Sequence, residues 1–110
     1  MFEILEYITE DSKKPFSDFL LGIKDKKAQV KIRSRLARAS MGNFGDWKSL
    51  DNANGIYEMR EHYGSGFRIF YKIQGKKIIL LLAGSTKSEQ DQTIAKAKKY
   101  LADYERRTKL

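Results

Sequence analysis

The sequence of 110 residues has no cysteine, a single histidine and a single proline. Without cysteine, the chain can form no disulfide, thiol nucleophile, zinc finger or iron–sulfur site. One histidine excludes histidine-rich metal sites and any catalytic triad that needs a second imidazole. The longest apolar run, 78–83, is far shorter than the ~20 residues of a membrane helix, and the N-terminus lacks the basic start of a signal peptide. We therefore expect a cytoplasmic protein that does not cross a membrane.

Two further absences concern cofactors. The acidic residues form no cluster with the spacing of a metal site, so two-metal phosphoryl chemistry is not expected. The glycine-containing stretch 42–45 lacks the lysine and the Ser or Thr of a nucleotide-binding loop. The sequence therefore predicts a protein that works without a metal or another cofactor.

The chain has an excess of positive charge. It contains 22 Lys and Arg against 14 Asp and Glu, which gives a formal net charge of +8. A surplus of this size suits a polyanionic partner, such as nucleic acid, an acidic protein or an anionic membrane surface. Apolar residues make up 41% of the chain, which is enough for a core, and no linker or repeat divides it. We expect one domain that spans residues 1–110.

The spacing of apolar residues predicts an early strand, two helices, four further strands and a last helix. The expected strands are 2–8, 47–50, 56–63, 67–74 and 76–83, and the expected helices begin at Pro15, shortly before Ala28 and at Ser88. The run at 78–82 does not alternate, so its strand should be covered on both faces. This order predicts an α+β fold: an N-terminal strand and a two-helix hairpin packed on a mostly antiparallel sheet, with a C-terminal helix.

A Gly-Ser-Gly segment at 64–66 predicts a tight hairpin between the two strands that flank it. If Tyr63 pairs with Phe67, alternation places one charged set of side chains on a single face of the sheet. That set is Glu58, Arg60, His62, Arg68, Phe70 and Lys72. One interpretation is a solvated face with a cross-strand ion pair between Glu58 and Lys72. The other is a phosphate-binding floor, in which the cations bind phosphate and the aromatic ring stacks a base.

Cations elsewhere also allow two interpretations. Lys87 lies where the chain turns into the last helix, so it is either an exposed loop lysine or a phosphate ligand beside backbone N–H groups that favour anions. The second helix has a basic stripe, which is either its solvated side or a track for phosphates. The stripe consists of Lys27, Lys31, Arg35 and Arg38. Phe44 and Trp47 lie beside glycines and are expected to fill the core.

Several stretches together resemble a known family. They are Gly-Asn-Phe-Gly-Asp-Trp-Lys-Ser-Leu at 42–50, Gly-Ile-Tyr-Glu-Met-Arg at 55–60, His-Tyr-Gly-Ser-Gly-Phe-Arg-Ile-Phe-Tyr at 62–71, the segment 78–84 and Lys-Ser-Glu-Gln at 87–90. In these stretches the chain resembles the RelE/ParE superfamily of toxins, above all the HigB-like branch of addiction-module killer proteins. The resemblance extends over nearly the whole chain. It departs from typical members at Phe67 and Phe70, where they have Tyr, and at Ser85 and Thr86, where they have Gly and Asp.

The resemblance implies a toxin of a type II toxin–antitoxin system. Its partner would be a cognate helix-turn-helix antitoxin, and the toxin would reach operator DNA only through that antitoxin. Many RelE-like members cleave mRNA, often on the ribosome, without a metal, and so inhibit translation. ParE-like members instead inhibit DNA gyrase and are not nucleases.

The resemblance also implies roles for individual residues. Cleavage by the RNA 2′-hydroxyl needs a base, cations for the charged phosphorane and an acid for the 5′ oxygen. Arg60 and Arg68 would hold the phosphate, and Lys87 would add charge or act as the acid. His62 would be base or acid, since histidine exchanges protons near neutral pH. Lys48 also matches the basic pattern of the family. The residues expected to contact RNA are Lys27, Lys31, Arg35, Lys48, Phe70 and Lys72.

One departure leaves alternatives open. RelE-type enzymes often have a Tyr or His early in the last helix, and Thr93 and Ile94 stand in that region here. The acid would then be His62 or Lys87, or the protein would not be a nuclease. Two alternatives follow: a ParE-like gyrase inhibitor whose helical hairpin binds protein, and a module that only binds its antitoxin.

Overall fold

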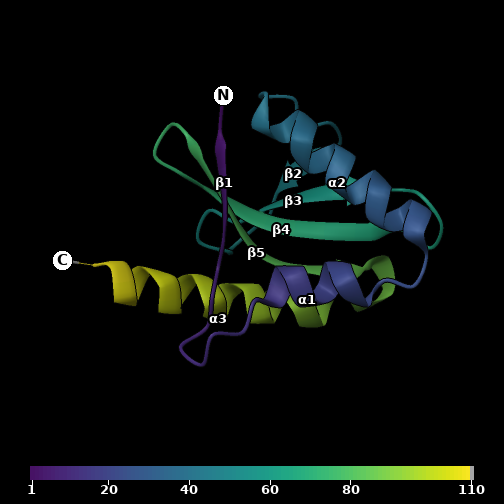
Figure 1. Cartoon of the computed structure of the whole chain (residues 1–110). Helices are drawn as coiled ribbons and strands as arrows, with labels where there is room; N and C mark the ends of the chain where they lie inside the picture. The colour runs from purple at the N-terminus through teal and green to yellow at the C-terminus, as the bar shows by residue number, and fades with distance from the viewer. Residues whose placement is uncertain (110) are drawn as a thin grey trace.

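The computed structural model describes residues 1–109 and has the α+β fold that the sequence predicts (Figure 1). Its elements follow the expected order. They are β1 (Glu3–Glu6), α1 (Pro15–Gly22), α2 (Lys26–Ser40), β2 (Trp47–Ser49), β3 (Tyr57–Glu61), β4 (Phe67–Gln74), β5 (Ile78–Thr86), the 3-10 turn η1 (Lys87–Glu89) and α3 (Gln90–Thr108). The strands form one sheet in the order β1-β5-β4-β3-β2, in which β1 is parallel to β5 and the other neighbours are antiparallel.

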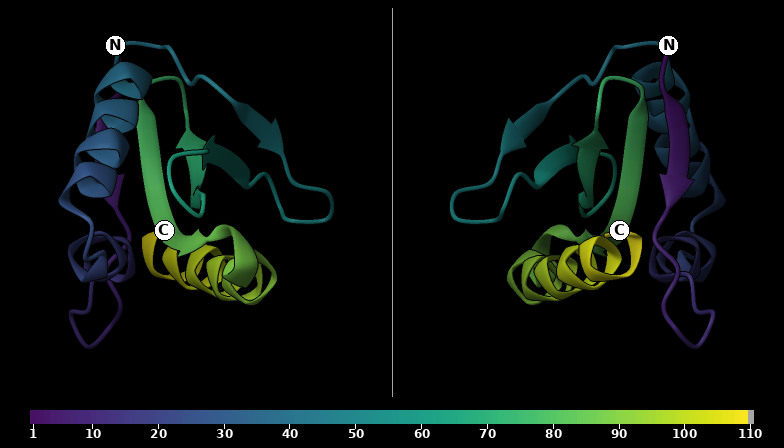
Figure 2. Two further views of the ribbon diagram at one scale, coloured as in Figure 1. Left: turned by 90° about the vertical axis from the view of Figure 1, so that its right-hand side faces the viewer. Right: turned by 90° about the vertical axis from the view of Figure 1, so that its left-hand side faces the viewer.

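Helices cover both faces of the sheet, so the protein has two apolar cores (Figure 2). The first core lies between the sheet and the pair α1 and α2. Its buried members include Phe16, Leu20, Ile32, Met59, Ile69 and Tyr71. The second lies between the sheet and α3, and its buried members include Ile56, Phe70, Leu80, Leu82, Ala97 and Leu101.

The helices begin and face the sheet as their sequences predict. α1 starts at the single proline, which suits the first turn. The side chain of Asp25 caps α2 by accepting a hydrogen bond from the N–H of Lys27 at 2.9 Å. Ala28, Ile32 and Ala39 of α2 are at most 1% exposed. These residues lie at helical spacing and form the face of α2 that packs on the sheet.

The strand predicted to be covered on both faces is β5. It lies between β1 and β4, and its residues Ile79, Leu80, Leu81 and Leu82 are each at most 3% exposed. Adjacent side chains of a strand point to opposite faces, so burial of four in a row requires cover on both sides. α1 and α3 both contact β5 and supply that cover.

The predicted register of the β3–β4 hairpin is wrong by two residues. Phe67 pairs with Glu61, not with Tyr63, because residues 62–66 form the turn, in which the N–H of Gly66 donates to the carbonyl of Tyr63. An even shift leaves the assignment of side chains to faces unchanged. It does remove the expected pair between Glu58 and Lys72, since Glu58 now lies opposite a phenylalanine.

The charged sheet face is not solvated over its length. α3 covers it, and Glu58, Arg68 and Phe70 are 2%, 6% and 0% exposed. The sequence places charges on this face but does not show that the apolar stripe of α3 must also be buried there. Trp47, expected in the core, is 49% exposed at the edge of the sheet, whereas Phe44 packs against the first core. None of the helices within residues 1–109 combines the length and apolar character needed to cross a membrane.

Candidate nucleic-acid interface

Four predicted site residues gather at the end of the sheet where the β3–β4 hairpin turns. Arg60 in β3 is the cross-strand partner of Arg68 in β4. His62 directly follows β3, and the turn then passes two glycines with positive φ. The N–H of Lys87, at the start of η1, donates to the carbonyl of Gly66 at 3.0 Å. The hairpin and the β5–η1 junction thus bring these cations to one end of the molecule.

Asp46, just before β2, holds two of them together. Arg60 donates to Oδ1 of Asp46 through Nε at 3.2 Å and Nη2 at 2.7 Å, and Nε2 of His62 lies 2.6 Å from Oδ2. The hydrogen bond with His62, and then that with Arg60, hold the pKa of the Asp46 carboxyl below its usual value. Asp46 is therefore a carboxylate that fixes an imidazole beside a guanidinium.

The side chain of His62 is 70% exposed while one of its ring nitrogens is held. Its Nε2 contacts Asp46, and within residues 1–109 no hydrogen bond involves its Nδ1. When Nε2 donates to the carboxylate, Nδ1 is an acceptor open to solvent. A carboxylate that orients an imidazole in this way is typical of a general base.

Arg68 lies behind this surface and is anchored on several sides. Its side chain is 7% exposed, and its Nε donates to Oε1 of Gln90 at 3.1 Å. The same Nε is 3.7 Å from a carboxylate oxygen of Glu58, which is also buried. Arg68 thus connects β4 to β3 and to the start of α3. Its position fits a structural cation near the site better than a direct phosphate ligand.

Two residues expected to touch RNA are buried in other roles, and these predictions are corrected. Phe70 has no exposed surface and packs under α3, so no base can stack on it. Arg35 is 8% exposed and turns inward from the basic stripe. It donates to the main-chain carbonyls of Arg60, Phe44 and Asp46, and its Nη1 lies 3.7 Å from Glu61. Arg35 therefore clamps the backbone under the site.

The remaining predicted RNA contacts are spread over the molecule. Lys72 lies toward the other end of β4, where it donates to Glu105 at 3.2 Å. Lys48 is exposed on β2 beside Glu58 in the ladder. Lys27 and Lys31 are exposed on α2, and the ammonium group of Lys31 lies 5.8 Å from the ring centroid of Tyr63 in the hairpin turn. Lys31 is thus close to the end of the sheet where the β3–β4 hairpin turns, whereas Lys72 is remote from that end.

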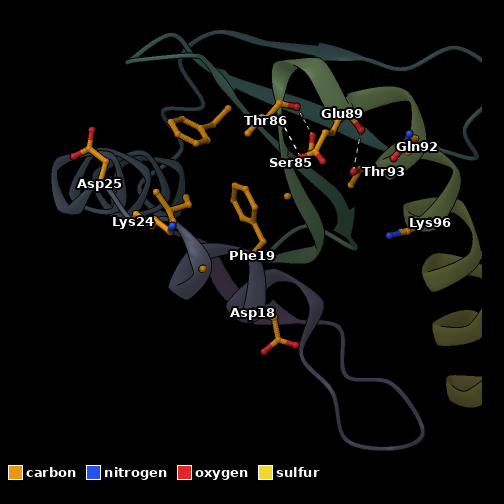
Figure 3. Close-up of a pocket in the computed structure, with 14 residues that line it drawn as sticks. Asp18, Phe19, Lys24, Asp25, Ser85, Thr86, Glu89, Gln92, Thr93 and Lys96 are labelled. Carbon is orange, nitrogen blue, oxygen red and sulfur yellow. Dashed lines mark hydrogen bonds between the residues drawn. The ribbon is translucent and has the colours of Figure 1, made fainter.

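A large cleft lies next to this end, between α1 and the start of α3 (Figure 3). The cleft has a volume of about 570 Å³, and the side chain of Phe19, from α1, lies in its centre. The β-carbon of an alanine at Gly84 would lie 2.2 Å from that ring, so the glycine allows Phe19 to lie on β5. Lys24 and Lys96 border the cleft from opposite sides, together with Asp18, Asp25 and Glu89. The predicted catalytic residues do not line it.

Comparison with known proteins gives the family. Residues 18–107 match the model of the family described as "Phage derived protein Gp49-like (DUF891)". The chain belongs to the Gp49-like family. A relative from Haemophilus influenzae, described as an uncharacterized protein, is 41% identical over 83 residues, which are 76% of this chain and 82% of that protein.

The exposed part of the site in this Gp49-like protein combines cations with the imidazole of His62, which Asp46 holds. Within residues 1–109, Lys87 takes part in none of the ion pairs, and it is exposed. Arg60 is partly exposed while paired with Asp46. An exposed ammonium and a guanidinium beside a base can attract a phosphate and stabilise negative charge that develops on it.

Asp46 and Gln90, which position predicted residues of this Gp49-like chain, were not predicted from the sequence, and Glu58 was predicted with Lys72 as its partner instead of Arg68. Asp46 lies 14 residues before Arg60, and its partnership depends on the pairing of β2 with β3. The sequence offers one weak signal, since Arg60 and His62 are two apart in a strand and so share a face on which an acid could meet both. Nothing in the pattern of α3 indicates that Gln90 contacts Arg68.

Proposed function

We propose that this Gp49-like protein is the toxin of a type II toxin–antitoxin system and a RelE-like, metal-independent endoribonuclease. Its substrate would be mRNA that is bound to the ribosome. Its activity would inhibit translation until an antitoxin binds. The observation on which the proposal rests is the exposed group of Arg60, His62 and Lys87, organised by Asp46. The net charge of +8 and the association of the Gp49-like family with addiction-module toxins support it.

The chemistry assigned to the site is attack of the 2′-hydroxyl of RNA on its neighbouring phosphorus. Nδ1 of His62 takes the 2′ proton, the new bond from the 2′ oxygen to phosphorus closes a cyclic phosphate, and the bond to the 5′ oxygen breaks. Lys87 stabilises the phosphorane and gives the 5′ oxygen its proton. Arg60 binds a non-bridging oxygen, and Arg68 adds positive charge from behind. These roles need no metal.

A purified system tests this chemistry. The protein is incubated with translating ribosomes and a labelled mRNA, with and without excess EDTA added after the ribosomes have been stabilised by polyamines. We expect cleavage that EDTA does not abolish and that His62→Gln lowers by ~100-fold or more. Lys76→Gln, which removes an exposed lysine from the distant β4–β5 turn, is the matched control. Equal cleavage by the wild type and His62→Gln would refute the assigned base.

A ParE-like gyrase inhibitor is the second candidate, and one observation favours it. Arg60 and Arg68 already have carboxylate or amide partners, as structural cations would. In that case the purified protein would block supercoiling of plasmid DNA by gyrase and leave mRNA intact. His62→Gln would not change that inhibition.

A further inference from the structure

An aromatic groove lies on the α2 side of the sheet, near its open edge. It has a volume of about 170 Å³ and is lined by Phe44, Trp47, Tyr57, Tyr71 and Ile73. The rings are ordered against one another: Phe44 stacks on Tyr71 at 5.8 Å, and Trp47 meets Tyr57 edge-on at 5.6 Å. Trp47 is nevertheless 49% exposed. A preformed apolar groove with an exposed tryptophan is typical of a surface that binds another protein.

The strand that bears Trp47 is the edge of the sheet. Figure 2 shows β2 at the margin, away from the three helices. Leu50 donates to Ile56 and the carbonyl of Asp46 accepts from Arg60, so these alternate positions of the segment face β3. Because the direction alternates along an antiparallel strand, the N–H and C=O groups of Trp47 and Ser49 point outward. The edge therefore offers hydrogen bonds to a further strand, directly beside the groove.

We infer that β2 and the groove bind an extended, acidic segment of a partner protein, which adds a strand to the sheet and inserts an apolar side chain beside Trp47. The identity of that partner as the antitoxin rests on the proposed function. The chemistry of the segment follows from the surface. Main-chain hydrogen bonds fix a strand at an edge while pockets select its side chains. The net charge of +8 favours an acidic segment, and the carboxylate of Asp46 is already paired.

The position of this surface links binding to the site. Asp46 directly precedes Trp47, and it holds Arg60 and His62. A segment that extends past the N-terminal end of β2 would run beside Asp46, and so close to the imidazole that Asp46 holds. Binding at the edge would thus shield the proposed base, with no need for the partner to enter the cleft beside α1.

Trp47 is the single tryptophan of the chain, which makes it a specific probe. The protein is labelled with 5-fluorotryptophan, and the unlabelled protein encoded by the neighbouring reading frame is added. We expect one fluorine resonance that shifts and becomes protected from solvent on binding. Two variants then test the two parts of the surface: Trp47→Ser empties one wall of the groove, and Ser49→Pro removes an outward N–H where an edge strand tolerates proline.

Both variants are expected to weaken binding of that protein by about 10-fold or more. Val30→Ser is the matched control, because it removes an apolar side chain that is 63% exposed on α2 outside the groove. The control should bind within about 2-fold of the wild type. Circular dichroism and thermal unfolding of each variant establish that it is folded.

Three results would overturn the inference. If the complex forms but the resonance does not shift and Trp47→Ser binds normally, the partner docks elsewhere, while the proposed function stands. If the resonance shifts with the concentration of this chain alone, a second copy occupies the groove. If the neighbouring protein does not bind the wild type, the inference and the partner in the proposed function fail together.

Discussion

At the scale of single residues, carboxylates and carbonyls fix the cations of the proposed site. Asp46 orients His62 and Arg60, while Arg35 binds three main-chain carbonyls beneath them. The exposed cations of the site are therefore supported by a buried one. Asp46 and Arg35 can be substituted separately, and the two substitutions should change the stability of the protein in different ways.

The first residue-scale prediction concerns the pH dependence of Asp46. Its carboxyl has a lowered pKa in the folded protein because of His62 and Arg60. A group of this kind stabilises the fold above its unfolded pKa of about 4, and the stabilisation is lost as the pH falls through the lower, folded pKa. Asp46→Asn should therefore be less stable than the wild type at pH 7, by less than about 1 kcal/mol because the pair is partly exposed. Urea unfolding at pH 7 and at successively lower pH checks this, and a difference that does not shrink as the pH falls below about 4 would contradict it.

The second residue-scale prediction concerns Arg35. Arg35→Ala removes the shared donor of three part-buried main-chain carbonyls and the cationic partner of Glu61, which should lower the free energy of unfolding by about 3 kcal/mol. Arg38→Ala, an exposed change in the same helix, should alter it by less than about 0.5 kcal/mol. Chemical denaturation of both variants measures the difference. Equal stabilities would mean that Arg35 is only part of a solvated stripe.

At the scale of elements, the fit of α1 on β5 depends on one glycine. Phe19 occupies the space where a β-carbon on Gly84 would lie, with its nearest ring atom at 2.2 Å. Gly84→Ala must therefore displace α1 or the ring, and we expect it to lower the free energy of unfolding by about 1–3 kcal/mol. Circular dichroism and chemical denaturation measure it.

Gly22→Ala is the control for that change. No atom lies within 4 Å of a β-carbon built at Gly22, the last residue of α1. Alanine favours helix over glycine by up to ~1 kcal/mol, so this variant should be as stable as the wild type or slightly more so. If both alanines had the same effect, close packing of α1 on β5 would not be the cause.

The elements also differ in how much of their structure the sequence predicts. Burial of β5 on both faces could be predicted because a short unbroken apolar run after a turn is typical of a strand that is covered on both sides. The faces of β3 and β4 could be predicted, but their register could not, since the length of the turn at 62–66 depends on its glycines and on η1 beside it. The inward turn of Arg35 could not be predicted, because a basic stripe does not show which of its members reaches main-chain carbonyls. Asp46 becomes part of the site only through the pairing of β2 with β3.

At the scale of the whole molecule, layers of helices cover the two faces of the sheet. The helices α1 and α2 cover one face and α3 the other, so both proposed functional surfaces lie at the ends and edges of the sheet (Figure 2). The hairpin end has the imidazole of His62, held by Asp46, and the exposed Lys87, and the β2 edge has the aromatic groove. Asp46 lies between the two. This arrangement connects the proposed catalytic end with the proposed binding edge.

The central claim is that the hairpin end cleaves mRNA. The most direct measurement is the mapping of new RNA 5′ ends across the transcriptome within minutes of inducing the protein. The account predicts new ends inside translated codons with the wild type, and their loss with His62→Gln expressed at the same level. Growth arrest with intact RNA would contradict it and favour a gyrase target, and wild-type cleavage by His62→Gln would contradict the assigned site.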